Sequence, residues 1–431
     1  MRTFWKKSRF IYVIVLTVLF TALVVGSYNA DAVEGLVTVK KDVQTITVGG
    51  DDADIPGYTS RAIQIAVDAL KSRGEGIVRL NPGQYDITAP VRLYTGVNLV
   101  GSGEKTVLHK SDSVSTNFTI DADYGMYKVT VKDASGFKAG MGIQLFDETH
   151  MGCWDATTAR ITSIEGSVLY IDTSLVHDYI GGSTGVITTS GSIVEAVNTE
   201  NVRMADFTVD GNAANNGGIT GCRGGGVYIH RSRNVTVENV KVQNFNGDSF
   251  SWQITENITV RKCEASHGTG LGFHPGTGSD SSVIENCISH HNGGDGIFLC
   301  WRVQNGIIRN NSVYANGRYG ISIGHKDTDN LFERNRVYEN GRHGVYFRDE
   351  NKENAGHRNT FRGNTIENNG STDFKAYGFY IDGETNDIVI ENNTIRSTGK
   401  GNQAGAVFVG GKASRVNADD NNVSGHPRIV K

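Results

Sequence analysis

The sequence predicts an all-β fold, a right-handed parallel β-helix with an N-terminal capping helix and a small inserted β subdomain. The main observation is a repeat in which Gly272, Gly296, Gly320 and Gly344 follow one another at intervals of 24 residues. A short alternating apolar run follows each glycine, and a second apolar run comes later in each repeat. Units this short cannot bury an apolar face alone, so neighbouring units must stack. Their richness in Gly, Asn, Val and Ile indicates strands rather than helices.

The repeat also predicts which side chains face outward. Stacked coils place equivalent residues above one another at about 4.8 Å per step. The first and third residues after the repeated glycine form the core, so the second and fourth must face outward. These outward residues are too aromatic and too varied for a plainly solvated face: Tyr228, His230, Ser251, Gln253, His274, Gly276, Phe298, Cys300, Ser322, Gly324, Tyr346, Arg348, Tyr380 and Asp382.

Two further patterns complete the predicted solenoid. Thr59 or Ser60 can cap a helix in which Ile63, Val67 and Leu70 share one face, which suits a lid over the open end of the first coil. Asn side chains recur at one corner of the repeat, where stacked amides can bond one another along the axis. These corner residues are Asn311, Asn335, Asn364 and Asn393.

The 24-residue rhythm is interrupted once, which sets the domain plan. Short β patterns without the repeat predict an inserted subdomain in this interval. The plan is a signal peptide at 1–32, the cap and first coils at 43–122, the inserted subdomain at 123–190, and the main β-helix at 191–431 with coils of 23–24 residues.

The N-terminal segment has the pattern of a secretory signal: basic residues, an apolar run, and Ala30-Asp31-Ala32 as a cleavage site. An uncleaved membrane anchor is the alternative, because the apolar run is near the lower limit for crossing a bilayer. We expect a secreted or cell-surface monomer that has no membrane contact after cleavage. A net charge of −4 with mixed signs gives no reason to expect a nucleic-acid partner.

Cysteine usage predicts no disulfide framework, because the chain has five cysteines, an odd number. Cys263 and Cys287 occupy the same repeat position and are expected to be stacked, buried thiols, although the stacking distance would permit a bond. No Cys or His spacing is typical of a metal site. No cluster of acidic metal ligands is recognisable either. The sequence therefore assigns no metal and leaves open whether Ca²⁺ is needed.

Two stretches resemble known families. The first contains Gly50-Asp51-Asp52, Leu80-x-Pro82-Gly83-x-Tyr85 and Gly96-Val97-x-Leu99-x-Gly101-x-Gly103, and it resembles the opening of pectate-lyase-like β-helix proteins. That resemblance implies the fold, but the superfamily includes lyases, hydrolases, epimerases and phage tailspikes.

The second stretch, Gly270-Leu271-Gly272-Phe273-His274-Pro275-Gly276 followed by Asn292-Gly293-Gly294-Asp295-Gly296, is similar to the catalytic module of mannuronan C5-epimerases. The family's catalytic Asp after the Asn-Gly turn carries over to Asp295. Its Tyr falls on Leu271, its first Asp on His274 and its His on Gly276, so three of the four positions differ. The resemblance therefore implies the fold, the location of the site and a carbohydrate substrate.

Lyases and epimerases that act on uronates both begin by removing the C5 proton while cationic groups stabilise charge on the carboxylate. The residues just before the repeated glycines include Asp295, Tyr319 and His343, which should be neighbours. We predict Tyr319 and His343 as acid and base, Asp295 as a residue that tunes them, and His274 and His325 as further catalytic candidates. The expected substrate-binding residues are Arg348, Lys326, Trp301, Phe298, Tyr346, Asp349, Tyr380 and Asp382.

The resulting hypothesis is an exported enzyme that acts on an acidic, uronate-containing polysaccharide by β-elimination or C5-epimerisation. Two alternatives use the same fold. The first is a glycoside hydrolase with paired carboxylates, against which the strip carries few Asp or Glu residues together. The second is a non-catalytic polysaccharide-binding or surface protein.

Overall fold

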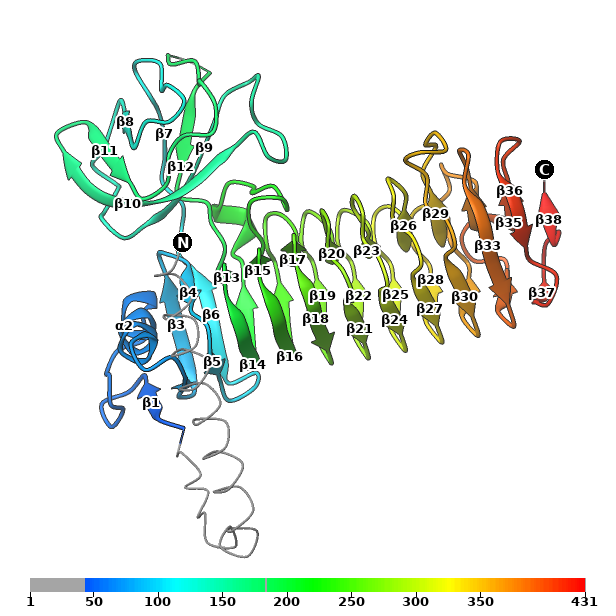
Figure 1. The fold of residues 1–431 in the computed structure, drawn as a ribbon, viewed down its shortest axis with the longest axis horizontal. Helices are drawn as coiled ribbons and strands as arrows, with labels where there is room; N and C mark the ends of the chain where they lie inside the picture. The colour runs from blue at the N-terminus through cyan, green and yellow to red at the C-terminus, as the bar shows by residue number, and fades with distance from the viewer. Residues whose placement is uncertain (1–42, 183, 431) are drawn as a thin grey trace, which may run out of the picture. The chain divides into compact units, whose positions relative to one another are not determined.

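A computed structural model describes residues 43–182 and 184–430 of the chain, and the predicted signal peptide at 1–32 lies outside them. The described chain is a right-handed parallel β-helix with one α-helix near its start and one inserted antiparallel sheet. Figure 1 shows the coils following one another from β13 to β38, each stacked on the one before. The predicted fold class is therefore confirmed.

The strands of the β-helix pair in three parallel columns. The first column holds β1 (Thr45–Val48), β2 (Gly76–Leu80), β5 (Val97–Val100), β14 (Glu200–Asp210), β16 (Arg233–Gln243), β18 (Glu256–Arg261), β21 (Val283–Glu285), β24 (Ile307–Arg309), β27 (Leu331–Glu333), β30 (Thr360–Arg362), β33 (Asn386–Glu391) and β36 (Ser414–Asn417).

The second column shares the long strands β14 and β16 with the first, which joins the two columns into one 21-stranded sheet. Its other members are β3 (Gly83–Ile87), β6 (Thr106–Lys110), β19 (Glu264–Ser266), β22 (Ile288–His290), β25 (Ser312–Tyr314), β28 (Arg336–Tyr338), β31 (Thr365–Glu367), β34 (Thr394–Arg396) and β37 (Asn422–Ser424).

The third column is an 11-stranded parallel sheet that carries the predicted outward strip. It contains β4 (Val91–Leu93), β13 (Val194–Val197), β15 (Val227–His230), β17 (Phe250–Gln253), β20 (Phe273–Pro275), β23 (Ile297–Phe298), β26 (Ile321–Ile323), β29 (Val345–Phe347), β32 (Ala376–Ile381), β35 (Gln403–Val409) and β38 (Ile429–Val430). A single 3₁₀ turn, η1 (Ala213–Asn215), lies between β14 and β15.

The register of the third column agrees with the 24-residue repeat. Ile297 pairs with Ile321 and Ile321 with Val345, so the residues that follow the repeated glycines are stacked. The inward side chains form the core, and the rings of Phe250 and Phe273 stack with their centroids 4.9 Å apart. Burial of this continuous apolar column is the main force that holds one coil on the next.

The helix α2 (Ser60–Lys71) covers the first coils as predicted. The Thr59 side chain caps it by accepting a hydrogen bond from the N–H of Ala62. Ile63, Val67 and Leu70 are fully buried and belong to the same core cluster as the strands. The apolar stripe of the helix thus closes the end of the core that would otherwise meet water.

The Asn corners form a buried hydrogen-bonded ladder along the axis. The Nδ2 of Asn311 donates to the Oδ1 of Asn335, and the same contact continues through Asn364 and Asn393 to Asn421, at 2.9–3.0 Å. Each amide oxygen also accepts a backbone N–H from the preceding coil. The predicted ladder is confirmed, and it satisfies corner groups that would otherwise be buried without partners.

The coils after β29 are longer than 24 residues, because loops add residues at two places. Leu331 pairs with Thr360, a spacing of 29, whereas Val345 pairs with Phe379, a spacing of 34. One addition therefore lies between β29 and β30, and the other between β31 and β32. The second loop carries Phe374 to the candidate site described below.

The inserted subdomain is a six-stranded antiparallel sheet with its own small core. It contains β7 (Ser115–Asn117), β8 (Lys128–Thr130), β9 (Gly142–Phe146), β10 (Thr157–Glu165), β11 (Val168–Ile171) and β12 (Val186–Thr188). The sheet begins with β7, upstream of the boundary at 123 that the sequence suggests, because this strand pairs with β12.

One disulfide corrects the prediction from the cysteine count. Cys153 of the subdomain is bonded to Cys222 of the β-helix, 69 residues away. The odd total arises because Cys263, Cys287 and Cys300 remain free. Cys263 and Cys287 are the buried, stacked thiols that the repeat predicts, with the N–H of Cys263 donating to the Cys287 sulfur at 3.4 Å.

We expect removal of this disulfide to loosen the subdomain selectively. In the chain-entropy description, a cross-link over 69 residues contributes about 4 kcal/mol. The double variant Cys153→Ser/Cys222→Ser should therefore be cut faster by protease within residues 115–188, while the coils from β24 onward stay resistant. Cys300→Ser is the matched control. Unchanged cleavage of the double variant would show that the bond holds nothing in place.

Within the ranges 43–182 and 184–430, no helix has the length and apolar character needed to cross a bilayer.

Candidate functional site

The outward residues of the third column form one continuous strip. Register places Tyr228, Ser251 and His274 above one another, and Phe298, Ser322, Tyr346 and Tyr380 continue the same file. Because every strand is parallel and in register, each outward side chain lies one strand spacing from the next. The register confirms that the second residues after the repeated glycines lie in one file, as the repeat predicts.

Four aromatic side chains of the strip lie in contact. The ring of Tyr319 stacks on that of Tyr346 with 4.3 Å between centroids, and the ring of His343 stacks on that of Tyr380 at 4.4 Å. Tyr319 and His343 are also stacked on each other, at 5.6 Å. Tyr346 and Tyr380 are partly exposed, so their faces can pack against the apolar side of a sugar ring.

Asp295 lies beside this aromatic group and is only 1% exposed. Its Oδ1 accepts the backbone N–H of Tyr319 at 3.1 Å and lies 3.6 Å from the Nε of Arg318. Burial raises the pKa of Asp295 to about 6, against the opposing effects of the Tyr319 N–H and of nearby arginines. A carboxyl with such a pKa can accept or release a proton near neutral pH.

Two arginines flank Tyr319, and both come from turns that precede the repeated glycines. The guanidinium of Arg318 lies over the Tyr319 ring at 5.6 Å, and that of Arg342 at 5.5 Å. Arg342 also donates to the Tyr319 hydroxyl, at 3.4 Å. The side chain of Arg318 is 53% exposed, so its charge faces solvent as well as Asp295. The two cations are placed to meet an anionic ligand on the strip.

His343 is neutral and is held as a hydrogen-bond donor. Its Nδ1 accepts the N–H of Tyr377 at 3.0 Å, so in the neutral ring the proton is assigned to Nε2. Burial, together with the charge of Arg342, lowers the pKa of His343 to about 3. Phe374 packs edge-on against the ring. The geometry therefore favours a donor role for His343 over the role of base.

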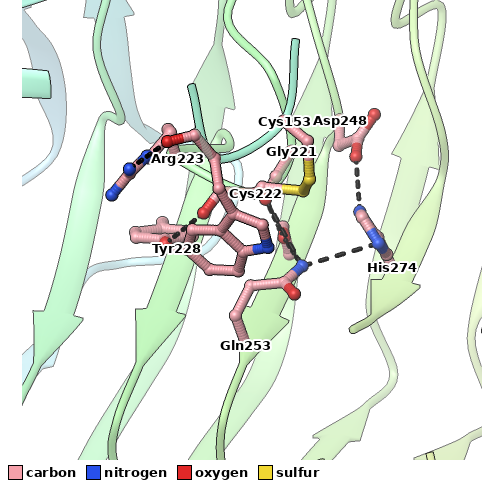
Figure 2. Close-up of a disulfide and its surroundings, with 10 residues drawn as sticks. Cys153, Gly221, Cys222, Arg223, Tyr228, Asp248, Gln253 and His274 are labelled. Atoms are coloured by element: carbon pink, nitrogen blue, oxygen red, sulfur yellow. Dashed lines mark hydrogen bonds and ion pairs between the residues drawn. A yellow bond between two sulfur atoms is a disulfide. The ribbon is translucent and has the colours of Figure 1, made fainter. Parts of the chain in front are cut away.

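His274 forms a buried pair with Asp248 (Figure 2), a partner that sequence reasoning missed. The Nδ1 of His274 lies 2.7 Å from the Oδ2 of Asp248. Burial alone would lower the pKa of His274, but hydrogen bonds to Asp248 and Cys300 overcome it and raise the pKa to about 9. The imidazole is thus a buried cation whose ring meets Phe298 edge-on at 5.4 Å. It is not a free base.

Arg348 reaches back across two coils instead of meeting Asp382. Its guanidinium binds Asp327 at 3.0 Å, the Ser322 hydroxyl at 3.0 Å and the carbonyl of Leu299 at 2.8 Å. It also covers the ring of Phe298, 4.7 Å from the centroid. The register places Phe347 level with Ile381, so the next residues, Arg348 and Asp382, lie in adjacent coils, but the Arg348 side chain pairs with the buried carboxylate of Asp327.

The remaining predicted residues form a second group. The ring of Trp301 stacks on that of His325 at 3.8 Å, and the Nδ1 of His325 lies 3.0 Å from Glu350. Lys326 is exposed, and Asp349 pairs with Lys412 at 3.6 Å. The described residues show no direct contact between this group and Asp295, Tyr319 or His343. Among the same residues, no group of three or more His, Cys, Asp or Glu side chains is arranged to hold a metal ion.

Comparison with protein families gives two matches. The right-handed β-helix region matches residues 192–361. The family described as rhamnogalacturonase A/epimerase, pectate lyase-like matches residues 47–274, which is more than half of the chain. The chain belongs to this pectate lyase-like family. No curated protein matches the sequence of this pectate lyase-like protein.

Solved structures similar to this pectate lyase-like protein share its fold at low identity. The A-module of the mannuronan C-5 epimerase AlgE4 of Azotobacter vinelandii is 20% identical with a TM-score of 0.55, over 86% of this chain and 93% of that one. The AlgE6 A-module of the same organism is 20% identical with a TM-score of 0.53, over 86% and 95%. PfbA, a surface adhesin of Streptococcus pneumoniae, is 14% identical with a TM-score of 0.51, over 90% and 93%.

Sequence reasoning missed several residues that the pectate lyase-like fold brings to the strip. Arg318 and Arg342 stand in Asn-Gly-Arg turns, and their equal spacing from the glycines was a usable signal. Asp248 stands in the same column as Asp295 but contacts His274 diagonally, three residues further along the next coil. Phe374 comes from an added loop outside the repeat, so no spacing could have indicated it.

Proposed function

We propose that this protein is an enzyme that removes the C5 proton of a uronate unit in an acidic polysaccharide, leading to β-elimination or C5-epimerisation. The observation that carries the proposal is the position of Asp295. It is a buried carboxyl with a pKa of about 6, next to Tyr319, which lies under two guanidinium groups. A base, a hydroxyl acid and cations for a carboxylate are the groups that this chemistry requires.

In the proposed mechanism, Arg318 and Arg342 bind the carboxylate of the substrate. The contact of Arg318 with Asp295 is long, 3.6 Å, so the substrate carboxylate can draw the guanidinium away and uncover the base. Asp295 then takes the C5 proton, and the electron pair of the C–H bond moves into the carboxylate, whose negative charge the arginines stabilise.

The second half of the reaction uses Tyr319 as the acid. In elimination, the electron pair returns to form the C4–C5 double bond, the C4–O bond breaks, and Tyr319 protonates the leaving oxygen. In epimerisation, the proton returns to C5 from the opposite face. In both reactions, the Nε2–H of His343 donates a hydrogen bond to the substrate. The exposed faces of Tyr346 and Tyr380 would hold the neighbouring sugar units.

We also propose that the protein acts outside the cytoplasm. The basic, apolar and small-residue pattern of residues 1–32 supports export. The Cys153–Cys222 disulfide supports it independently, because such bonds persist in oxidising compartments.

The proposal is tested by incubating the purified protein with alginate, polygalacturonate and glycosaminoglycans. Unsaturated uronates are followed by ultraviolet absorbance, inversion at C5 by proton NMR, and hydrolysis by new reducing ends. We expect one of the first two signals on at least one substrate. New reducing ends without unsaturated product would identify a hydrolase. Binding without any chemical change would identify a carbohydrate-binding protein, and either result would overturn the proposal.

The pH dependence follows from the ionisation of Asp295. A base must be ionised to accept a proton, and burial places the pKa of this carboxyl at about 6. We therefore expect kcat/KM to rise with pH through about 6 and then to level, since this parameter reports the free enzyme. A profile that rises near pH 4, as for an ordinary solvated carboxyl, would remove Asp295 from the role of base.

A further inference from the structure

A cleft lies between the inserted subdomain and the first outward residues of the strip. Its volume is about 390 Å³. The β-helix contributes Arg223, Tyr228, His230 and Arg231 to its lining, and the subdomain contributes Thr158 and Asp172. None of these residues takes part in the site at Asp295.

Two arginines in this cleft have no carboxylate partner among the described residues. A third lining arginine, Arg92, is bound to both Glu195 and Asp172, at 2.6 and 2.9 Å, and its charge is therefore balanced. Arg223 instead donates to the backbone carbonyl of Trp154, and its Nε is buried without a partner. Arg231 is exposed, with no ion pair in the described part of the chain. Burial lowers the pKa of Arg223, which is partly buried, and this desolvation cost is reduced if an anionic ligand pairs with the guanidinium.

An aromatic side chain, Trp154, lies behind two of the residues that line the cleft and is partly exposed. Trp154 lies under the guanidinium of Arg223 at 5.1 Å and beside the ring of His230 at 5.7 Å. The Nε2 of His230 is buried and has no hydrogen-bond partner. Burial, with the charges of Arg231 and Arg223, lowers the pKa of His230 to about 4, so the imidazole is neutral and can hydrogen bond to a hydroxyl.

The disulfide fixes the two halves of this arrangement. Trp154 directly follows Cys153, and Arg223 directly follows Cys222, so the covalent bond sets the ring against the guanidinium. Figure 2 shows Cys222, Arg223 and Tyr228 around this bond. The hydroxyl of Tyr228 donates to the carbonyl of Cys222 at 2.7 Å, which holds the segment on the strip.

We propose that the cleft is a second binding site for an acidic sugar unit, in which Arg223 and Arg231 bind the carboxylate and Trp154 packs against the ring. The choice of a uronate rests on the proposed function, whereas the binding of an anionic saccharide does not. Tyr228 is three strand steps from Phe298, roughly 14 Å along the strip. A single polysaccharide chain must therefore be several units long to occupy both sites.

The test measures equilibrium binding of short and long uronate oligosaccharides to the full chain carrying Asp295→Asn, which separates binding from turnover. Arg223→Gln and Arg231→Gln are each expected to weaken binding of the long oligosaccharides by about 10-fold, the effect of losing one charge-assisted hydrogen bond. Oligosaccharides too short to span both sites should still bind at the Asp295 site, and that binding should be unchanged. Arg79→Gln, on the exposed face of β2, is the control and should bind like the parent.

Each outcome decides the question. Unchanged binding in both variants, or an equal loss in Arg79→Gln, would overturn the proposal. The side chain of Arg231 makes no hydrogen bond or ion pair in the described structure, so its variant stays informative if Arg223→Gln folds poorly. A parallel series with sulfated dextran separates the anions: a loss seen only there would assign the cleft to sulfate and overturn the uronate assignment. Full turnover by Asp295→Asn would instead refute the catalytic site and leave the cleft standing.

Discussion

Replacing Asp295 with asparagine is expected to lower kcat by about 10²–10⁴-fold, the usual contribution of a general acid or base. The amide keeps the oxygen that accepts the Tyr319 N–H at 3.1 Å but cannot take a proton. Tyr319→Phe should cause a loss of the same order because it removes the proposed acid. Tyr338→Phe on β28, a ring that stacks on Tyr314 in the second column, is the matched control and should keep full activity.

Asp295→Asn should also be more stable than the parent above pH 6. Burial raises the pKa of Asp295 from 3.8 to about 6. The folded state therefore binds the proton more tightly, and stability is lost as pH rises through that window. Asparagine does not ionise, so above pH 6 its free energy of unfolding should exceed that of the parent by up to about 3 kcal/mol. Below pH 4 this difference should vanish. If Asp295→Asn lost activity together with stability at every pH, the activity loss would reflect damage to the fold.

The largest loss of stability is expected from Asn335→Ala. Asn335 accepts hydrogen bonds from the backbone and side chain of Asn311 and donates to Ile308 and Asn364. Alanine would leave several of these buried groups unpaired, at a total cost of about 4 kcal/mol. The exposed Asn422→Ala on β37 should change the free energy of unfolding by less than about 0.5 kcal/mol.

Denaturant unfolding of the two variants beside the parent measures this difference. A small effect of Asn335→Ala, close to that of Asn422→Ala, would mean that the Asn ladder forms because the coils stack and adds little to the free energy of unfolding.

The sequence determined the columns of the fold well because the repeat is regular. Once Gly296 and Gly320 are equivalent, every residue near them is assigned to the core or to the outward face by the alternation of a strand. The same logic located the Asn ladder and brought Tyr319 and His343 together. It also placed Phe298 and Tyr346 in one file, as the register shows.

The repeat could not predict the contacts of side chains that reach residues of another column. Arg348 pairs with Asp327 and His274 pairs with Asp248. In both pairs a cationic side chain contacts a buried carboxylate of another column, because an unpaired buried charge is unfavourable. The disulfide partner of Cys153 could not be predicted either, because the inserted subdomain has no repeat from which its position relative to the coils could be derived. The tautomer of His343 depends on a single backbone N–H, which no residue pattern reveals.

The most direct test of the proposed chemistry follows the C5 proton of the uronate by NMR in D₂O, on the substrate that responds in the polysaccharide assay. Elimination and epimerisation both remove this proton, one by forming the C4–C5 double bond and the other by returning deuterium. We predict that the C5 signal declines with the parent chain and persists with Asp295→Asn. A C5 signal that stays intact while the parent chain shortens or binds the polysaccharide would contradict the account.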